Sequence, residues 1–203
     1  MIAAFDLGVR NFAFAVKNKD EFILLKNTTL NDNIMTKTDL NKYKKKDLIE
    51  MLEDLHITIQ EKLNKNDIIN HIITHTKKSN KKVDLGLAMF ETMDMYKDFW
   101  NKCDTFLIER QLMSNLQALK LSHYLEAYLK IYYPSKQVIN YNASNKTKKL
   151  GGSHLKTKKE RKKWTIDYAL QLLTGDNLRC FKNLDKQDDV ADAICMIEAY
   201  IKV

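Results

Sequence analysis

The chain is poor in the residues that interrupt regular structure or cross-link a fold. Its 203 residues include one proline, five glycines and three cysteines, and no two cysteines have the CxxC spacing. This odd, scattered set of thiols excludes a disulfide scaffold and predicts reduced cysteines in an intracellular compartment. No run of about 18 apolar residues is present, so no membrane-spanning helix is expected. The first residues lack a basic region followed by an apolar core, so no signal peptide is predicted.

Arginine is also scarce, with four among the 34 basic residues, and yet the chain is basic. A net charge of +8 and a pI near 9.2 favour a polyanionic partner, and nucleic acid is the commonest one. Between residues 143 and 163, nine basic residues and one acid leave +8, so the rest of the chain is neutral on balance. We expect this segment to be a basic loop that binds nucleic acid through Lys146, Lys148, Lys149, Lys156, Lys158, Arg161, Lys162 and Lys163.

Hydrophobic patterning predicts an α/β fold. Short apolar or alternating runs predict strands at 2–6, 11–16, 22–25, 105–109 and 137–140. Helical periodicity predicts helices at about 112–133, 160–173 and 185–201. The polar segment 28–100 has a helical period and no linker composition, so it is expected to be a helical insertion. Residues 1–203 are therefore predicted to form one domain, a five-stranded mixed sheet flanked by helices.

Carboxylates stand at the ends of these predicted elements. Asp6 and Glu109 each end an apolar strand, and the last helix begins with the run Asp188-Asp189-Val190-Ala191-Asp192. Asp189 and Asp192 are three residues apart, so they share one helical face. Acids beside a buried apolar stripe lose hydration, so a positive group must stabilise them. Oxygen ligands suit Mg²⁺ or Mn²⁺, and two such ions about 4 Å apart can activate water for phosphodiester cleavage.

Each of these residues also has an ordinary explanation. Acids in the first turn of a helix stabilise its dipole, and a glutamate at the end of a strand is commonly solvated. Trp100 and Trp164 could stack on bases, but core packing accounts for them as well. The combination of two acid-ended strands with a paired-acid helix is what favours a metal site.

The same residues carry a resemblance to a known family. The run Asp6-Leu7-Gly8-Val9-Arg10-Asn11 resembles the D-x-G-x-x-N first strand of the RNase H-like superfamily. The segment Ile108-Glu109-Arg110-Gln111-Leu112-Met113-Ser114-Asn115 is similar to the second acidic motif of the RuvC-type Holliday junction resolvases, and Asp188 to Ala193 resembles their C-terminal D-x-x-D helix. The long 28–100 segment and the lysine-rich loop make the chain more similar to the resolvases of poxviruses and related large DNA viruses.

This resemblance implies an RNase H-like fold and an Mg²⁺-dependent, homodimeric endonuclease that cuts four-way DNA junctions in viral recombination or replication. Mn²⁺ is expected to substitute, and no small-molecule cofactor is implied. The implied metal ligands are Asp6, Glu109, Asp189 and Asp192. Asp188 is a weaker, fifth candidate, because its side chain points about 100° away from that of Asp189 on the helix. Such resolvases place a lysine near the scissile phosphate, for which the candidates are, in order, Lys159, Lys162 and Lys163. A viral protein of this kind would act in the host cytoplasm or nucleus, at replication sites.

Three other classes share some of these features. An actin-like ATPase would need a second D-x-G hairpin and more glycine than this chain has. A non-catalytic DNA-binding scaffold would not need all four acids. Another RNase H-like nuclease, acting on RNA–DNA hybrids or transposon ends, would share the same acids. Resolution of a junction also needs two sites, and helix 112–133 is the candidate dimer interface through Leu116, Leu119, Tyr124 and Tyr128, which core packing could equally use.

Overall fold

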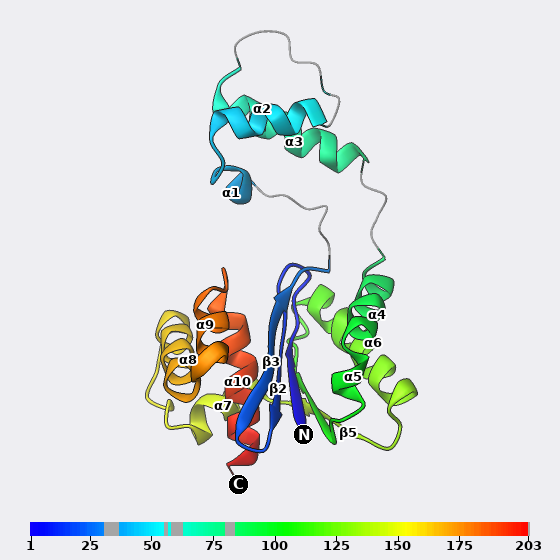
Figure 1. The fold of residues 1–203 in the computed structure, drawn as a ribbon, viewed down its shortest axis with the longest axis vertical. Coiled ribbons are helices and arrows are strands. Elements are labelled where there is room, and N and C mark those ends of the chain that lie inside the picture. The colour runs from blue at the N-terminus through cyan, green and yellow to red at the C-terminus, as the bar shows by residue number, and fades with distance from the viewer. Residues whose placement is uncertain (31–36, 55–56, 58–62, 80–83, 203) are drawn as a thin grey trace. The chain divides into compact units, whose positions relative to one another are not determined.

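The computed structural model describes residues 1–30, 37–54, 57, 63–79 and 84–202. They belong to two compact units, one formed by residues 1–30 and 85–203 and the other by residues 31–84. The first unit holds the sheet and all the predicted site residues, and the second is a small group of helices (Figure 1). Each unit is described by itself.

The sheet of the first unit has five strands in the order β3-β2-β1-β4-β5. The strands are β1 (Ile2–Asp6), β2 (Phe12–Asn18), β3 (Glu21–Thr28), β4 (Thr105–Glu109) and β5 (Gln137–Tyr141). The first three pair antiparallel, whereas β1 with β4 and β4 with β5 pair parallel. The predicted α/β class and mixed five-stranded sheet are confirmed.

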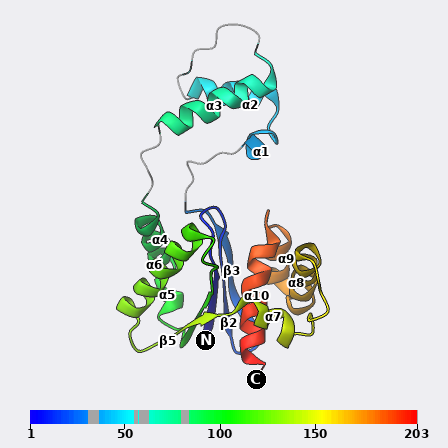
Figure 2. The ribbon, with the colours of Figure 1, turned by 180° about the vertical axis from the view of Figure 1, so that it is seen from behind.

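Helices cover both faces of this sheet (Figures 1 and 2). One face carries α4 (Leu85–Met95), α5 (Lys97–Trp100) and α6 (Leu116–Tyr132), and the other carries α7 (Ala143–Lys149), α8 (Lys158–Leu172), α9 (Gly175–Lys182) and α10 (Gln187–Ile201). Alternation along β1 explains the two layers, because Phe5 packs in the first core and Ala4 in the second. The small side chains on the second face let α10 lie against β1 and β2 with most of its residues buried.

The second unit consists of α1 (Lys37–Leu40), α2 (Lys45–Asp54) and α3 (Lys65–Ser79). It has its own apolar core, in which the buried side chains are Leu40, Leu48, Leu52, Ile68, Ile69 and Ile72. The helical character predicted for 28–100 is present in the described residues, but the segment is divided between the two units. Residues 85–100 belong to the sheet unit, because Met89, Met93 and Trp100 pack into its core.

The basic segment 143–163 differs from the predicted loop. It contains α7 and the first turns of α8, so only residues 150–157 connect helices. Asn142 caps α7 by accepting a hydrogen bond from the Ser144 amide, and Thr157 and Glu160 form a capping box that begins α8. Helix α9 was not predicted from the sequence.

Candidate active site

The two strand-ending acids lie side by side at one edge of the sheet. Strands β1 and β4 are parallel and pair Phe5 with Ile108, so the next residues, Asp6 and Glu109, end the two strands together. Their carboxyl groups are hydrogen bonded to each other. Burial and the charge of Glu109 raise the pKa of Asp6 well above its ordinary value. Burial also opposes ionisation of Glu109, but Lys146 outweighs it and lowers the pKa of Glu109.

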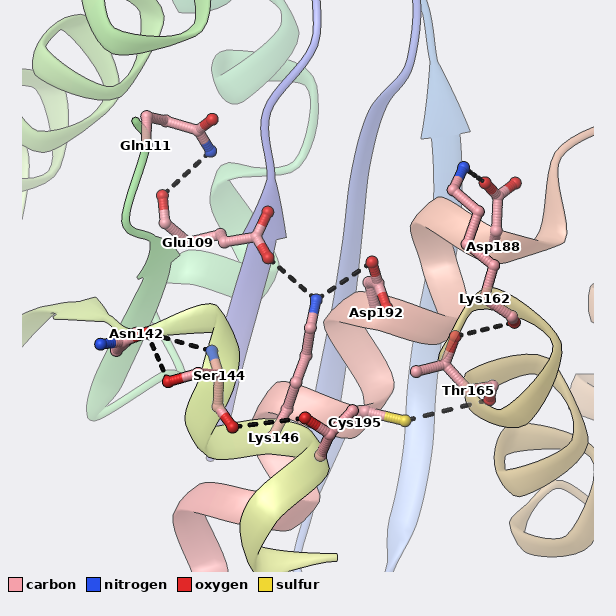
Figure 3. A network of polar contacts seen from close by, with 11 residues as sticks. Glu109, Gln111, Asn142, Ser144, Lys146, Lys162, Thr165, Asp188, Asp192 and Cys195 are labelled. Carbon is pink, nitrogen blue, oxygen red and sulfur yellow. Dashed lines mark hydrogen bonds and ion pairs between the residues drawn. The ribbon is translucent and has the colours of Figure 1, made fainter. Parts of the chain in front are cut away.

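A buried lysine stands between Glu109 of β4 and Asp192 of α10 (Figure 3). The ammonium Nζ of Lys146 lies 2.8 Å from Glu109 Oε1 and 3.0 Å from Asp192 Oδ2, and the lysine is 6% exposed. Burial by itself lowers the pKa of a lysine, but the charges of Asp192 and Glu109 prevail and the pKa of Lys146 is raised. The ammonium is therefore charged and bridges β4 to α10.

The acids of α10 point to different partners. Asp192 faces Lys146, although burial still raises its pKa. Asp188 pairs with Lys162 of α8, and this contact lowers the pKa of Asp188 against the effect of burial. Asp189 lies between them in sequence, and burial and the charge of Asp188 raise its pKa. Its Oδ2 atom is buried, and no hydrogen-bond donor in the described part of the chain reaches it. An unpartnered buried oxygen of this kind is costly unless a cation reaches it.

The donors fit a divalent cation in kind. Carboxylate oxygens are the ligands that Mg²⁺ and Mn²⁺ prefer, and the acids outnumber the one ammonium that lies among them. In the described residues, however, no group of three or more His, Cys, Asp or Glu side chains is arranged to hold a metal ion. The ammonium of Lys146 lies between Glu109 and Asp192.

The other predicted basic residues lie outside this cluster. Lys148, Lys149, Lys156, Lys158, Lys159, Arg161, Lys162 and Lys163 are exposed on or beside α7 and α8. Lys162 contacts Asp188, and Arg161 donates 2.9 Å to the backbone oxygen of Lys156. The structure thus brings Lys146 into contact with the acids, while Lys159 lies exposed in the first turn of α8. No signal in the sequence distinguished Lys146 from the neighbouring lysines of the basic segment.

The remaining candidates are placed as follows. Trp100 is fully buried and donates its indole N–H to the Met93 oxygen, so it belongs to the core. Trp164 is half-buried and packs beside Tyr168. On α6, Tyr128 is buried and hydrogen bonded to Asp94, whereas Leu116 is 71% exposed. Tyr128 therefore belongs to the core rather than to an outer surface.

The fold is that of the RNase H-like Holliday junction resolvases. The chain matches the Fowlpox virus resolvase, solved with its substrate Holliday junction DNA, at a TM-score of 0.53 and 15% identity over 98% of this chain and 95% of that one. It matches the yeast mitochondrial Holliday junction resolvase at a TM-score of 0.51 and 16% identity, over 99% of this chain and 78% of that one. The resemblance predicted from the three acidic motifs is confirmed at the level of the fold.

In sequence, the chain belongs to the same family as uncharacterized protein 97L of Invertebrate iridescent virus 3. The two are 54% identical over 206 residues, which span 100% of both chains. Uncharacterized protein 170L of Invertebrate iridescent virus 6 is 29% identical over 231 residues, covering 98% of this chain and 87% of its own length. No protein-family model matches the chain. No helix in the described residues combines the length and the apolar character that crossing a membrane requires.

Proposed function

We propose that this protein is an Mg²⁺-dependent, structure-specific DNA endonuclease that resolves four-way junctions during viral recombination or replication. The observation that carries the proposal is the gathering of acids from β1, β4 and α10 at one sheet edge of a resolvase fold. The fold alone would not indicate an activity, because one fold can host unrelated functions. The acids of the site supply the chemical reason for proposing an activity, because the packing of an apolar core does not require charged side chains at these positions.

Asp6, Glu109, Asp189 and Asp192 would hold the cations, with Mn²⁺ able to replace Mg²⁺. Bound divalent cations supply Lewis acidity, which activates water and stabilises the leaving oxygen in phosphodiester hydrolysis. The protein's part is to present the oxygens on rigid elements. Two come from paired strands, and two from a helix whose apolar residues are almost entirely buried.

The exposed basic residues of α7 and α8 would hold the DNA backbone near these acids. The contact between Lys162 and Asp188 ties α8 to the acid-bearing end of α10, so the basic surface adjoins the site. Phosphate contacts of this kind position DNA without reading its sequence. A lysine close to the acids would also offset the charge that builds on the phosphate oxygens. Lys159 is the first candidate from the sequence for that role, and Lys146 is a second candidate because it contacts Glu109 and Asp192.

The active form is proposed to be a homodimer. A four-way junction has two equivalent strands to cut, and one chain holds one set of these acids. A second site related by a two-fold axis must therefore come from another copy. Three exposed apolar residues at or just before the start of α6 are candidates for this contact, namely Leu112, Met113 and Leu116.

The test is a cleavage assay on three substrates in Mg²⁺: a fixed four-way junction, the matching duplex and an RNA–DNA hybrid. The proposal expects paired nicks in the junction and little cleavage of the other two. Cleavage of the hybrid alone would identify another RNase H-like nuclease. Binding of the junction without cleavage in Mg²⁺ or Mn²⁺ would identify a non-catalytic scaffold.

A further inference from the structure

Two acids of the site are paired with a lysine of the protein itself. Lys146 is the buried cation that reaches both Glu109 and Asp192, and these two acids come from different elements, β4 and α10. Two partly buried carboxylates without a counter-ion would repel each other and would have lost part of their hydration. The ammonium therefore holds together, in the metal-free protein, the elements that form the site.

An oxygen that accepts a hydrogen bond from the Lys146 ammonium binds a metal ion less strongly than it would without that hydrogen bond. The ammonium lies at hydrogen-bond distance, 2.8 Å from Glu109 Oε1 and 3.0 Å from Asp192 Oδ2. Mg²⁺ prefers oxygen ligands at about 2.0–2.1 Å, so a cation bound to these two oxygens would compete with the ammonium for them. Asp189 Oδ2, by contrast, is buried and has no hydrogen-bond partner in the described residues, so a cation that reached it would displace no ammonium hydrogen bonded to it.

We propose that Lys146 is the resident counter-ion of the metal-free site and that divalent cations must displace its ammonium from Glu109 or Asp192 in order to bind. The inference rests on the proposed function in one respect, namely that the acids take a divalent cation. It adds that the affinity for this cation is set partly by competition from the protein's own lysine. The metal-free site would thus keep its structure, but it would bind divalent cations more weakly than a site without the lysine.

The decisive experiment measures metal binding without DNA. Lys146→Met keeps the length of the side chain and removes its charge. Titration calorimetry with MgCl₂ and with MnCl₂ is expected to show at least tenfold tighter binding by Lys146→Met than by the unaltered protein. Without metal, the variant should melt at a lower temperature than the unaltered protein. Added Mg²⁺ should raise the melting temperature of the variant by more than it raises that of the unaltered protein.

The matched control is Lys17→Met. Lys17 is a partly buried lysine that also pairs with an acid of α10, at 2.5 Å from Glu198, but it is in β2 and away from Glu109 and Asp192. This variant should lower the melting temperature and leave metal affinity unchanged. It therefore separates general loss of a buried ion pair from loss of a competing cation.

A second measurement uses the unaltered protein, so the inference does not depend on a variant that folds. With ¹⁵N-labelled lysine, the protected ammonium signal of Lys146 should shift or exchange faster as Mg²⁺ is added, while that of Lys17 stays in place. Unaltered or weaker metal binding by Lys146→Met, in a protein that binds Mg²⁺ and cuts junctions, would overturn the inference alone. Absence of Mg²⁺ binding in every variant, with no cleavage, would overturn the proposed function and this inference with it.

Discussion

At the scale of single residues, the site combines an excess of acid with one buried base. Asp6 and Glu109 share a hydrogen bond, and Lys146 supplies the charge that keeps Glu109 ionised. Glu109 thus contacts both other members and is the residue whose charge the cluster depends on most. Replacing it by its amide would keep the shape and remove the charge.

Glu109→Gln is therefore expected to reduce junction cleavage by roughly 100-fold or more, because the lost charge weakens the hold on the cations and leaves Lys146 without one partner. Junction binding should survive, since the basic surface is untouched. Gel assays of cleavage and binding check both halves. The matched control is Glu126→Gln on α6, where Glu126 pairs with Lys130 at a partly exposed position. Cleavage within tenfold of the unaltered protein would show that Glu109 is no ligand.

The three thiols offer an independent test of the residue environments. Cys103 and Cys195 are buried, and burial raises the pKa of Cys103 to about 12 and that of Cys195 further still, whereas Cys180 is exposed. Alkylation of the folded protein at pH 8 should modify Cys180 alone, and denaturant should expose all three. Peptide mass spectrometry identifies the sites. Rapid labelling of Cys103 in the folded state would contradict the packing of the first core.

The acids could be predicted from the sequence, and the lysine could not. Asp6 and Glu109 each follow an uninterrupted apolar run, and the end of such a run is easily located. Lys146 stands among many lysines of similar surroundings in the sequence. Only the phase of α7, fixed by the Asn142 cap, turns this one lysine inward. Cap geometry decides that phase, and composition does not report it.

At the scale of elements, the basic segment is a helix, a connection and a second helix rather than a loop. Its abundance of lysine suggested a loop, but Asn142 and the Thr157–Glu160 capping box start helices within it. Strands were easier to predict than helices, because β1 and β4 are apolar runs with sharp ends. Residues 85–100 are rich in apolar side chains, but they share a helical period with the polar residues before them, and this hid their place in the first core until the structure was known.

The exposed lysines at the start of α8 give a prediction at this scale. Neutralising Lys158, Lys159 and Lys163 together should weaken junction binding and flatten the slope of log K against log salt by about 2 to 3, since each released counter-ion contributes roughly 0.7 to 0.9. Lys162 is left in place because it pairs with Asp188. The control neutralises Lys97, Lys102 and Lys120, exposed residues on or beside the helices of the opposite sheet face. An unchanged slope would place the DNA path elsewhere.

At the scale of the whole molecule, the described residues hold one cluster of acids of this kind, and the proposed substrate has two equivalent strands. A single copy could nick one strand, but symmetric resolution requires a second copy placed by a two-fold axis. The structure narrows the candidate interface on α6. Tyr128 is core, whereas Leu116 is 71% exposed and adjoins Leu112 and Met113, which are 74% and 79% exposed. Exposed apolar groups of this size in a cluster are typical of interaction surfaces.

We therefore expect a dimer in solution and paired nicks at symmetric positions on opposing strands of a fixed junction. Light scattering at micromolar protein measures the first, and strand-specific end labelling measures the second. Leu116→Asp should weaken the dimer at least tenfold, since it buries a charge without a partner in an isologous contact. It should convert paired nicks into single ones while each copy keeps its acids. The control is Met95→Asp on α4, which is 70% exposed and lies on a different helix. A monomer that nicks one strand only, in the unaltered protein, would leave a nuclease of this fold without the symmetry that resolution requires.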